Sequence, residues 1–318
     1  MNRNLGLELI RATEAAALAA AHWMGKGDAL SADQAAVNAM HKALSAIEFS
    51  GTVALGEGEP AVVRQLHHGE RVGADGPGEY DLALDALECT RSVAFGRSNA
   101  MAVIALAPHN HFRVPLTQYL DKLAVGPAAA GVIDLKELAT ENLRRIARAK
   151  ECEVRDLTVV MLDRERHRQL IEEVRAAGAK IHLIPDGDVA AAIAAATTGS
   201  GIDVLMGIGG SSAGVLAAAA LRCLGGEIQT RPVPFDRREK EQLRERGFDD
   251  LNRIYTAADL VQGDDVMFAA TGITDGDVLN GVRFRPGGAA THSLVTRSRT
   301  RTRRYIVTEH FFDEPTMS

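Results

Sequence analysis

Residues 157–206 read LTVVMLDRERHRQLIEEVRAAGAKIHLIPDGDVAAAIAAATTGSGIDVLM, and this stretch decides the fold class. Short aliphatic runs, typical of buried strands, alternate in it with longer segments that have helical spacing. This alternation is typical of βαβ units around a parallel core, so it predicts an α/β fold. The expected strands are residues 157–162, 180–184 and 202–206, and the expected helices are residues 164–177 and 188–196.

The N-terminal part of the chain has a different texture, with two helices ahead of a group of strands. An alanine-rich helix is expected over residues 5–24, and Ser31 is expected to be the N-cap of a second helix. Because the texture changes between residues 130 and 155, we predict two sheet-containing subdomains, residues 1–140 and 141–318. The C-terminal strands are free in this scheme to return to the first sheet. Further strands are expected at residues 51–55, 80–85, 100–107 and 266–270, and further helices at residues 137–150, 213–224 and within 229–250.

The composition of the 318-residue chain limits its classes of function. A hydrophobic fraction of 46% and 30 glycines suit a soluble α/β protein. The net charge of −6 argues against general nucleic-acid binding, which needs a basic surface. Arg297, Arg299, Arg301 and Arg303 recur at period two and would share one face of a strand. We interpret this row as a solvated or subunit-facing edge.

Cysteine use and hydropathy indicate the cellular setting. Cys89, Cys152 and Cys223 are spaced too widely for a zinc motif, and one is left over if two pair. A reduced cytoplasmic setting is therefore expected. The N-terminus lacks an apolar core of signal-peptide length, and no apolar stretch is long enough to span a membrane, so no membrane partner is expected.

The clearest chemical signal is the segment DLALDALECTR at residues 81–91. A buried strand that ends in Asp85-x-x-Glu88 can turn both carboxylates and the Leu87 carbonyl toward one or two divalent cations. Mg²⁺ and Mn²⁺ are hard cations and prefer such oxygen ligands. Thr90 supplies a hydroxyl that can orient a water molecule. The segment therefore predicts a metal-dependent phosphate-ester site that needs further acids from elsewhere.

Two upstream segments offer those acids. Asp33 is expected in the first turn of its helix, where the alternative is that it only complements the helix dipole. Glu57 and Glu59 follow a strand and are flanked by glycines that let the backbone curl around an ion. The alternative there is an acidic hairpin turn. Three acidic segments of this kind favour a shared site.

Polar residues also follow three successive strands of the second half, where ligands of open parallel sheets bind. Each has a simpler alternative, namely surface ion pairs for the arginines, turn or N-cap roles for the aspartates, and a tight turn for the glycines. Recurrence at three strand ends favours a binding site for a phosphorylated ligand. The residues are Arg164 and Arg166, then Asp186 and Asp188, then the glycine-rich loop of residues 207–214.

Together these segments resemble bacterial class II fructose-1,6-bisphosphatase, of the lithium-sensitive sugar-phosphatase superfamily. The likeness extends from the N-terminus to about residue 310. It rests on Asp33 and its helix, Gly56-Glu57-Gly58-Glu59, Asp85-x-x-Glu88-x-Thr90-Arg91, Tyr119-x-x-Lys122, Arg166-His167, Pro185-Asp186-Gly187-Asp188, residues 207–210 and residues 270–274.

The resemblance implies a layered α/β/α/β/α sandwich and a Mg²⁺- or Mn²⁺-dependent phosphoric monoester hydrolase. The implied substrate is fructose 1,6-bisphosphate or sedoheptulose 1,7-bisphosphate, and the implied assembly is a homodimer or homotetramer. Carried over to this chain, the metal ligands are Asp33, Glu57, Asp85 and Glu88, and the catalytic residues are Glu57, Thr90 and Asp33. The implied substrate-binding residues are Glu88, Thr90, Tyr119, Arg164, Arg166, Asp186, Asp188 and Gly210.

The chain departs from the family pattern inside these same segments. The most consequential change is Ala213, which stands where the family has a metal-binding glutamate, because a methyl group cannot ligate a cation. Three accounts remain open: a sugar bisphosphatase with a replacement ligand, a divergent paralogue for another phosphorylated sugar or polyol, and a catalytically impaired sugar-phosphate-binding protein. The other departures are Gln34, Ala86, Cys89 and Ser212.

Overall fold

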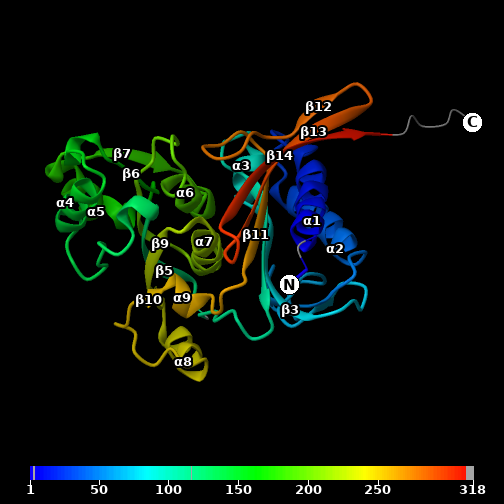
Figure 1. The fold of residues 1–318 in the computed structure, drawn as a ribbon, viewed down its shortest axis with the longest axis horizontal. Helices are drawn as coiled ribbons and strands as arrows, with labels where there is room; N and C mark the ends of the chain where they lie inside the picture. Colours follow the sequence, from blue (N-terminus) through cyan, green and yellow to red (C-terminus); the bar gives the residue numbers. More distant parts are fainter. Residues whose placement is uncertain (3, 116, 313–318) are drawn as a thin grey trace, which may run out of the picture. The chain divides into compact units, whose positions relative to one another are not determined.

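The computed structural model describes residues 1–2, 4–115 and 117–312, in which the chain forms two compact units (Figure 1). The first unit comprises Met1–Leu106, Met267–Arg297 and Thr302–Ser318, and the second comprises Ala107–Val266 and Ser298–Arg301. The chain thus changes unit before the expected boundary at residue 140. The reason is that the strand Tyr119–Val125 pairs with strands of the second sheet.

The first unit is built on an eight-stranded mixed sheet in its described residues. The order is β12-β13-β11-β4-β3-β1-β2, and β14 pairs with β13. β1 and β3 are parallel, whereas β11 is antiparallel to both β4 and β13. The C-terminal strands therefore complete the N-terminal sheet. The strands are β1 (Ser50–Leu55), β2 (Arg71–Val72), β3 (Glu79–Glu88), β4 (Met101–Pro108), β11 (Met267–Gly272), β12 (Arg283–Arg285), β13 (Gly288–Arg297) and β14 (Thr302–Phe311).

Two helices, α1 (Leu5–Ala21) and α2 (Ala29–Leu44), pack against this sheet, and α3 (Thr90–Ala94) follows β3. The alanines of α1 that face inward are fully buried, so the small side chains let the helix approach its neighbours closely. Thr13 of α1 also hydrogen-bonds Thr271 of β11 through their hydroxyls at 2.7 Å. A polar contact at that depth fixes where the helix lies on the sheet.

The second unit carries a six-stranded sheet in the order β10-β9-β5-β8-β6-β7. Only β6, β7 and β8 are parallel neighbours, and β5 runs antiparallel to β8 and β9. The predicted parallel core is therefore limited to the βαβ stretch that suggested it. The strands are β5 (Tyr119–Val125), β6 (Thr158–Leu162), β7 (Lys180–Ile184), β8 (Val204–Gly210), β9 (Glu227–Val233) and β10 (Tyr255–Thr256).

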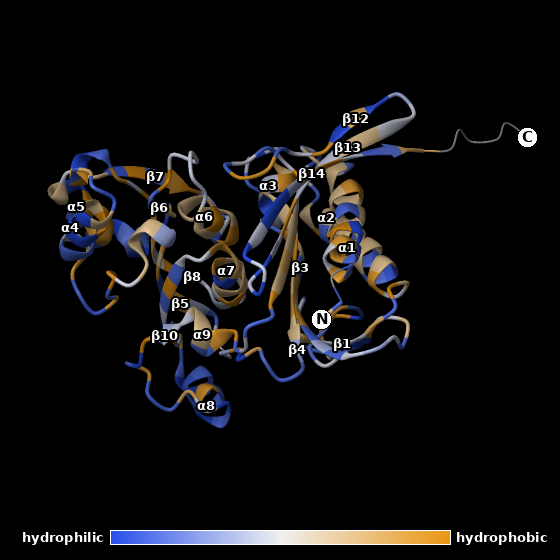
Figure 2. Cartoon of the chain, in the orientation of Figure 1, coloured by the Kyte–Doolittle hydropathy of each residue, from blue (hydrophilic) through white to orange (hydrophobic). Residues whose placement is uncertain are grey.

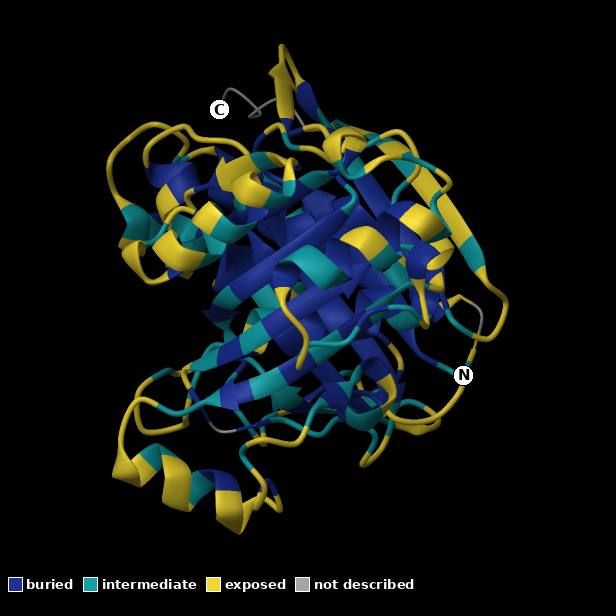
Figure 3. Ribbon diagram, turned by 90° about the vertical axis from the view of Figure 1, so that its left-hand side faces the viewer, coloured by how far each residue is buried: buried dark blue, intermediate teal, exposed yellow. Residues whose placement is uncertain are grey.

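Helices cover both faces of the second sheet, α6 and α7 on one side and α4 and α5 on the other (Figure 1). α8 is hydrophilic around most of its surface (Figure 2). Buried residues gather on the strands and the inner helix faces (Figure 3). The helices are α4 (Ala139–Ala149), α5 (Arg168–Ala177), α6 (Asp188–Ala195), α7 (Ser211–Leu224), α8 (Arg237–Glu245) and α9 (Ala257–Leu260), with 3₁₀ turns η1 (Pro127–Ala129), η2 (Val154–Asp156) and η3 (Glu165–His167).

The two mixed sheets, each covered by helices, confirm the predicted α/β class. No helix within the described residues combines the length and the apolarity that crossing a lipid bilayer requires.

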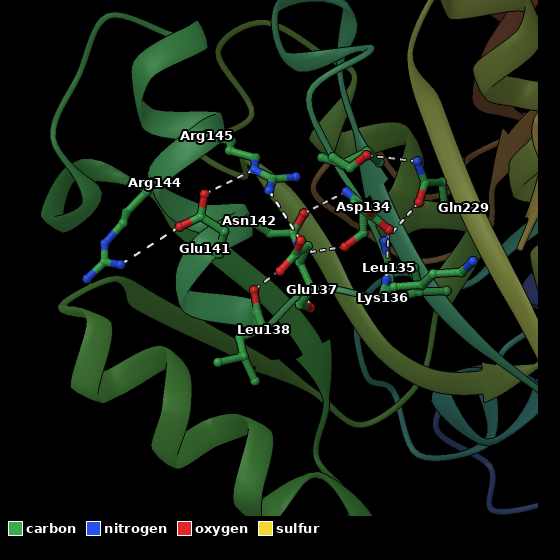
Figure 4. A network of polar contacts seen from close by, with 11 residues as sticks. Asp134, Leu135, Lys136, Glu137, Leu138, Glu141, Asn142, Arg144, Arg145 and Gln229 are labelled. Carbon is green, nitrogen blue, oxygen red and sulfur yellow. Dashed lines mark hydrogen bonds and ion pairs between the residues drawn. The ribbon is translucent and has the colours of Figure 1, made fainter.

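A buried asparagine organises the loop ahead of α4 (Figure 4). Asn142 is 2% exposed; its Oδ1 accepts from the Asp134 N–H, and its Nδ2 donates to the Asp134 carbonyl, both at 2.8 Å. Leu135 N–H donates to Gln229 Oε1 of β9. These contacts tie the loop to a helix and to a strand of the same unit.

Three local expectations were wrong. Asp28, and not Ser31, is the N-cap of α2, because its carboxylate accepts from Ser31 N–H at 3.0 Å. Residues 229–233, expected to begin the solvated helix and connection of residues 229–250, belong instead to β9, whose alternate side chains are buried. The arginine row does not share a strand, since Arg297 ends β13 and Arg303 belongs to β14, with a turn between them. A residue that recurs at every second position is compatible with a single strand and also with two strands of a hairpin joined by a turn inside the row.

Candidate active site

The end of β3 presents the acids that the sequence singled out. Asp85 lies within the strand, Glu88 ends it, and Cys89 turns the chain into α3 with a left-handed φ of 71°. Thr90 opens that helix and donates its hydroxyl to the Leu87 carbonyl at 3.2 Å. The Asp85 carboxylate accepts from Leu87 N–H at 3.1 Å. The turn thus brings carboxylates, a hydroxyl and a carbonyl into one short segment.

Glu57 reaches the same segment from the loop that follows β1, the strand parallel to β3. Its carboxylate accepts from Ala86 N–H at 2.9 Å, so its side chain lies beside the backbone that follows Asp85. Gly56 makes the approach possible, because a Cβ at that position would lie 2.0 Å from the Leu66 carbonyl oxygen. Glu59 is exposed in the following loop.

Asp33 joins from α2. Its Oδ1 accepts from the Thr90 hydroxyl across 3.4 Å, which is a long contact. Because the helix begins at Ala29, Asp33 lies in its second turn. The dipole of the first turn, offered as the alternative role for this acid, therefore does not explain its placement.

The electrostatics show that the three carboxylates interact. Burial raises the pKa of Glu57 to about 8, and the negative charges of Asp85 and Asp33 add to this rise. The hydrogen bond from Ala86 N–H opposes it. Burial also raises the pKa of Asp33, and the hydrogen bond from Thr90 opposes that rise. Like charges held this close destabilise one another unless a proton or a cation intervenes.

The donor set is made of oxygens, namely the carboxylates of Asp33, Glu57 and Asp85 with the Thr90 hydroxyl and the Leu87 carbonyl. Such a set fits a hard divalent cation. Across the described ranges, however, no three His, Cys, Asp or Glu side chains meet in a group that would hold a metal ion. Glu88, the fourth expected ligand, is buried at the end of β3.

A second group of predicted residues lies at the carboxyl end of β8 in the second unit. Gly210 ends this strand opposite Tyr119 of β5. The Arg166 guanidinium lies over the Tyr119 ring at 4.9 Å and donates to the Ile208 carbonyl at 2.8 and 3.1 Å. The structure therefore brings an exposed arginine, an aromatic ring and a glycine backbone together, and the arginine is the group among them that can pair with a phosphate.

The two remaining predicted segments differ in exposure. Arg164 is partly exposed and donates to the Asp163 carbonyl, and Asp186 is partly exposed beside Gly187. Asp188, in contrast, is 5% exposed, and its carboxylate pairs with Lys122.

Sequence reasoning missed two residues that support this loop. The Lys122 ammonium is buried against Asp188. His167 is also buried; its Nδ1–H donates to the Leu162 carbonyl and its Nε2 accepts from Ile208 N–H, both at 2.8 Å. Both residues belong to segments that carry the family resemblance, which was their only signal in the sequence.

Comparison with known proteins agrees with these observations. A family model described as bacterial fructose-1,6-bisphosphatase, glpX-encoded, matches residues 3–310. A relative from Crocosphaera subtropica, named D-fructose 1,6-bisphosphatase class 2/sedoheptulose 1,7-bisphosphatase, is 42% identical over 340 residues, covering 99% of this chain and 98% of its own. A relative of the same name from Synechococcus sp. strain JA-3-3Ab is 42% identical over 337 residues, covering 98% and 97%. The predicted resemblance is confirmed, and the chain belongs to the bacterial, glpX-encoded fructose-1,6-bisphosphatase family.

Proposed function

We propose that this chain is a divalent-cation-dependent phosphatase that hydrolyses one phosphate monoester of a sugar bisphosphate. Fructose 1,6-bisphosphate and sedoheptulose 1,7-bisphosphate are the proposed substrates, by analogy with the named relatives. The observation that carries the proposal is that the charges of Asp33 and Asp85 both act on Glu57, while the Thr90 hydroxyl contacts Asp33. Such a cluster of mutually repelling acids has no structural benefit without a positive ligand.

The chemistry follows from what these side chains can do. Mg²⁺ or Mn²⁺, held by Asp33, Glu57, Asp85 and Glu88, would supply a Lewis acid that acidifies the attacking water and neutralises charge on the phosphate. Glu57 and Thr90 are the proposed pair that orients this water and accepts its proton. The water oxygen forms a bond to phosphorus, the ester P–O bond breaks, and the sugar oxygen leaves with a proton.

The resemblance assigns the binding of the sugar phosphate to residues of the second unit. Arg166 and Arg164 can neutralise the phosphate that is not cleaved, Tyr119 can pack on the sugar, and the backbone at Gly210 can donate or accept hydrogen bonds. Asp186 is partly exposed and can accept from sugar hydroxyls. These assignments come from the family resemblance and agree with the exposure of each side chain.

Ala213 is the reason to keep the alternatives. It lies in the first turn of α7 and offers a methyl group where the family has a carboxylate. A divergent paralogue for another phosphorylated sugar or polyol, or a sugar-phosphate-binding protein without turnover, would follow from a cluster that binds its cation too weakly.

The test is release of inorganic phosphate from a panel of sugar mono- and bisphosphates with Mg²⁺ or Mn²⁺. Release from either proposed bisphosphate, lost on adding a chelator, supports the proposal. Release only from another phosphorylated sugar or polyol supports the paralogue. Binding of a sugar phosphate in a calorimeter without any turnover supports the binding protein and contradicts the enzyme.

We also propose a cytoplasmic homodimer or homotetramer, as the resemblance implies. Strand β14 supports self-association because Tyr305, Val307 and Phe311 of one face are 44%, 70% and 79% exposed. If two copies of β14 pair antiparallel about Ile306, Tyr305 lies opposite Val307, and Arg303 lies opposite Glu309. Light scattering should give a mass of at least twice 33.9 kDa, and Val307→Asp should lower it.

A further inference from the structure

Lys122 is a lysine in the interior of the second unit. It lies in the middle of β5 and is 1% exposed, whereas lysines are almost never fully buried unless they are paired. Its ammonium forms an ion pair with Asp188, which opens α6 and is 5% exposed. The two charges compensate each other, so the pair attracts a phosphate far less than a lone lysine would.

The same ammonium is attached to the candidate substrate loop. Lys122 Nζ donates to the Gly210 carbonyl at 2.9 Å, at the junction between β8 and α7. This bond fixes the plane of the peptide that follows Gly210. Ser211 N–H in turn donates to the Gln118 carbonyl at 3.1 Å, next to Tyr119. The junction is therefore held from both sides by residues of the β5 segment.

The space for the pair depends on Gly209. A Cβ at this position would lie 1.8 Å from Asp188 Oδ2 and 2.8 Å from Lys122 Nζ. Its φ is not in the left-handed region, so backbone freedom is not the reason for glycine here. The missing side chain is what lets the carboxylate and the ammonium meet beneath the loop.

We propose that Lys122, held in place by its ion pair with Asp188, is a positioning residue that sets the Gly210 peptide for substrate binding and does not itself contact the substrate. The proposal rests on the proposed function of the loop. The pair does not alter the substrate-binding role that the resemblance implies for Asp188, because a carboxylate can accept more than one hydrogen bond.

The chain offers a matched control in Lys150 and Asp203. This is a second lysine–aspartate pair of the same unit, and Asp203 accepts from Thr158 N–H just before β8 begins. It holds the opposite end of the strand from Gly210. Removal of this pair perturbs the same sheet without touching the substrate loop.

The experiment compares Lys122→Met, the charge-balanced double variant Lys122→Met/Asp188→Asn, and Lys150→Met. Phosphate release gives KM and kcat for the best substrate. Calorimetry in the presence of a cation that does not support turnover, such as Ca²⁺, gives the affinity for the same substrate. We expect Lys122→Met to raise KM about ten-fold or more, the cost of one charge-assisted hydrogen bond. Lys150→Met should leave KM within about two-fold of the wild-type value, because this pair is distant from the substrate loop.

The double variant separates positioning from charge balance. It removes both buried charges, so it should be more stable than Lys122→Met, yet its KM should stay high because the Gly210 carbonyl has lost its donor. A wild-type KM in the folded double variant overturns the proposal, as does an equal rise in Lys150→Met. If the wild-type protein releases no phosphate, the proposed function fails, and the calorimetric affinities still decide whether the pair positions the loop.

Discussion

At the scale of single residues, Cys89 shows how local backbone geometry serves the acidic cluster. Its φ of 71° is left-handed, which any residue with a Cβ adopts at a cost of about 1 kcal/mol relative to glycine. The family resemblance implies a glycine where Cys89 stands. The chain keeps the turn between Glu88 and Thr90 and accepts the strain.

This strain predicts an unusual order of stability. The free energy of unfolding of Cys89→Gly should be about 1 kcal/mol larger than that of Cys89→Ala, because only the alanine retains the strained Cβ. The two variants remove the same thiol, so burial of sulfur cancels in the comparison. Urea unfolding measures both values; an alanine variant as stable as the glycine variant would show that the turn is not strained.

Ala213 gives a second prediction at this scale. Restoring the family acid with Ala213→Glu should tighten Mn²⁺ binding several-fold or more if the position serves the cluster, as one added carboxylate does in oxygen-ligand sites. Ser212→Glu adds the same charge one residue away, at an exposed position, and is the control. If the two variants raise the calorimetric affinity for Mn²⁺ equally, the added negative charge alone explains the effect, and position 213 has no special role.

At the scale of elements, the strands and helices with strong periodicity were predictable, and those that depend on distant partners were not. Residues 157–224 fold as expected because their apolar runs are long and separated by helices. β9 was missed because its alternation is diluted by charged residues on its polar face. The acids of the candidate site could be singled out because each lies near the end of a strand or a helix. Lys122 was missed because its burial depends on Asp188, 66 residues away.

The loop before α4 gives a prediction for an element. Asn142→Leu keeps the side-chain size but leaves the Asp134 N–H and carbonyl without their partner, so it should cost about 2–3 kcal/mol of unfolding free energy. Arg144→Leu, on the exposed side of the same helix, should change it by less than about 0.5 kcal/mol. Similar losses in the two variants would contradict the role given to the asparagine.

At the scale of the whole molecule, the cluster should make stability depend on pH. The pKa of Glu57 is raised to about 8, so the folded protein holds a proton that the unfolded chain releases near 4.5. The stability of the cation-free protein should therefore fall between about pH 4.5 and 8, by at most about 1.4 kcal/mol per pH unit. Thermal unfolding in a chelator from pH 5 to 8 tests this.

Two controls make the pH test specific. Glu57→Gln cannot ionise and should flatten the dependence, and saturating Mn²⁺ should reduce it because a cation favours the charged carboxylate. The same slope in the glutamine variant would assign the effect to other groups.

The central claim is that the acids near the ends of β1 and β3 catalyse a cation-dependent hydrolysis of a phosphate ester. The most direct measurement is initial phosphate release from fructose 1,6-bisphosphate as Mn²⁺ is titrated, with wild-type protein and Asp85→Asn. The account predicts saturable activation of the wild type and at least about a hundred-fold lower rate for the variant at every concentration, since one lost electrostatic contact of this kind costs about 2.7 kcal/mol or more. Equal rates for the two proteins, or release that ignores Mn²⁺, would contradict it.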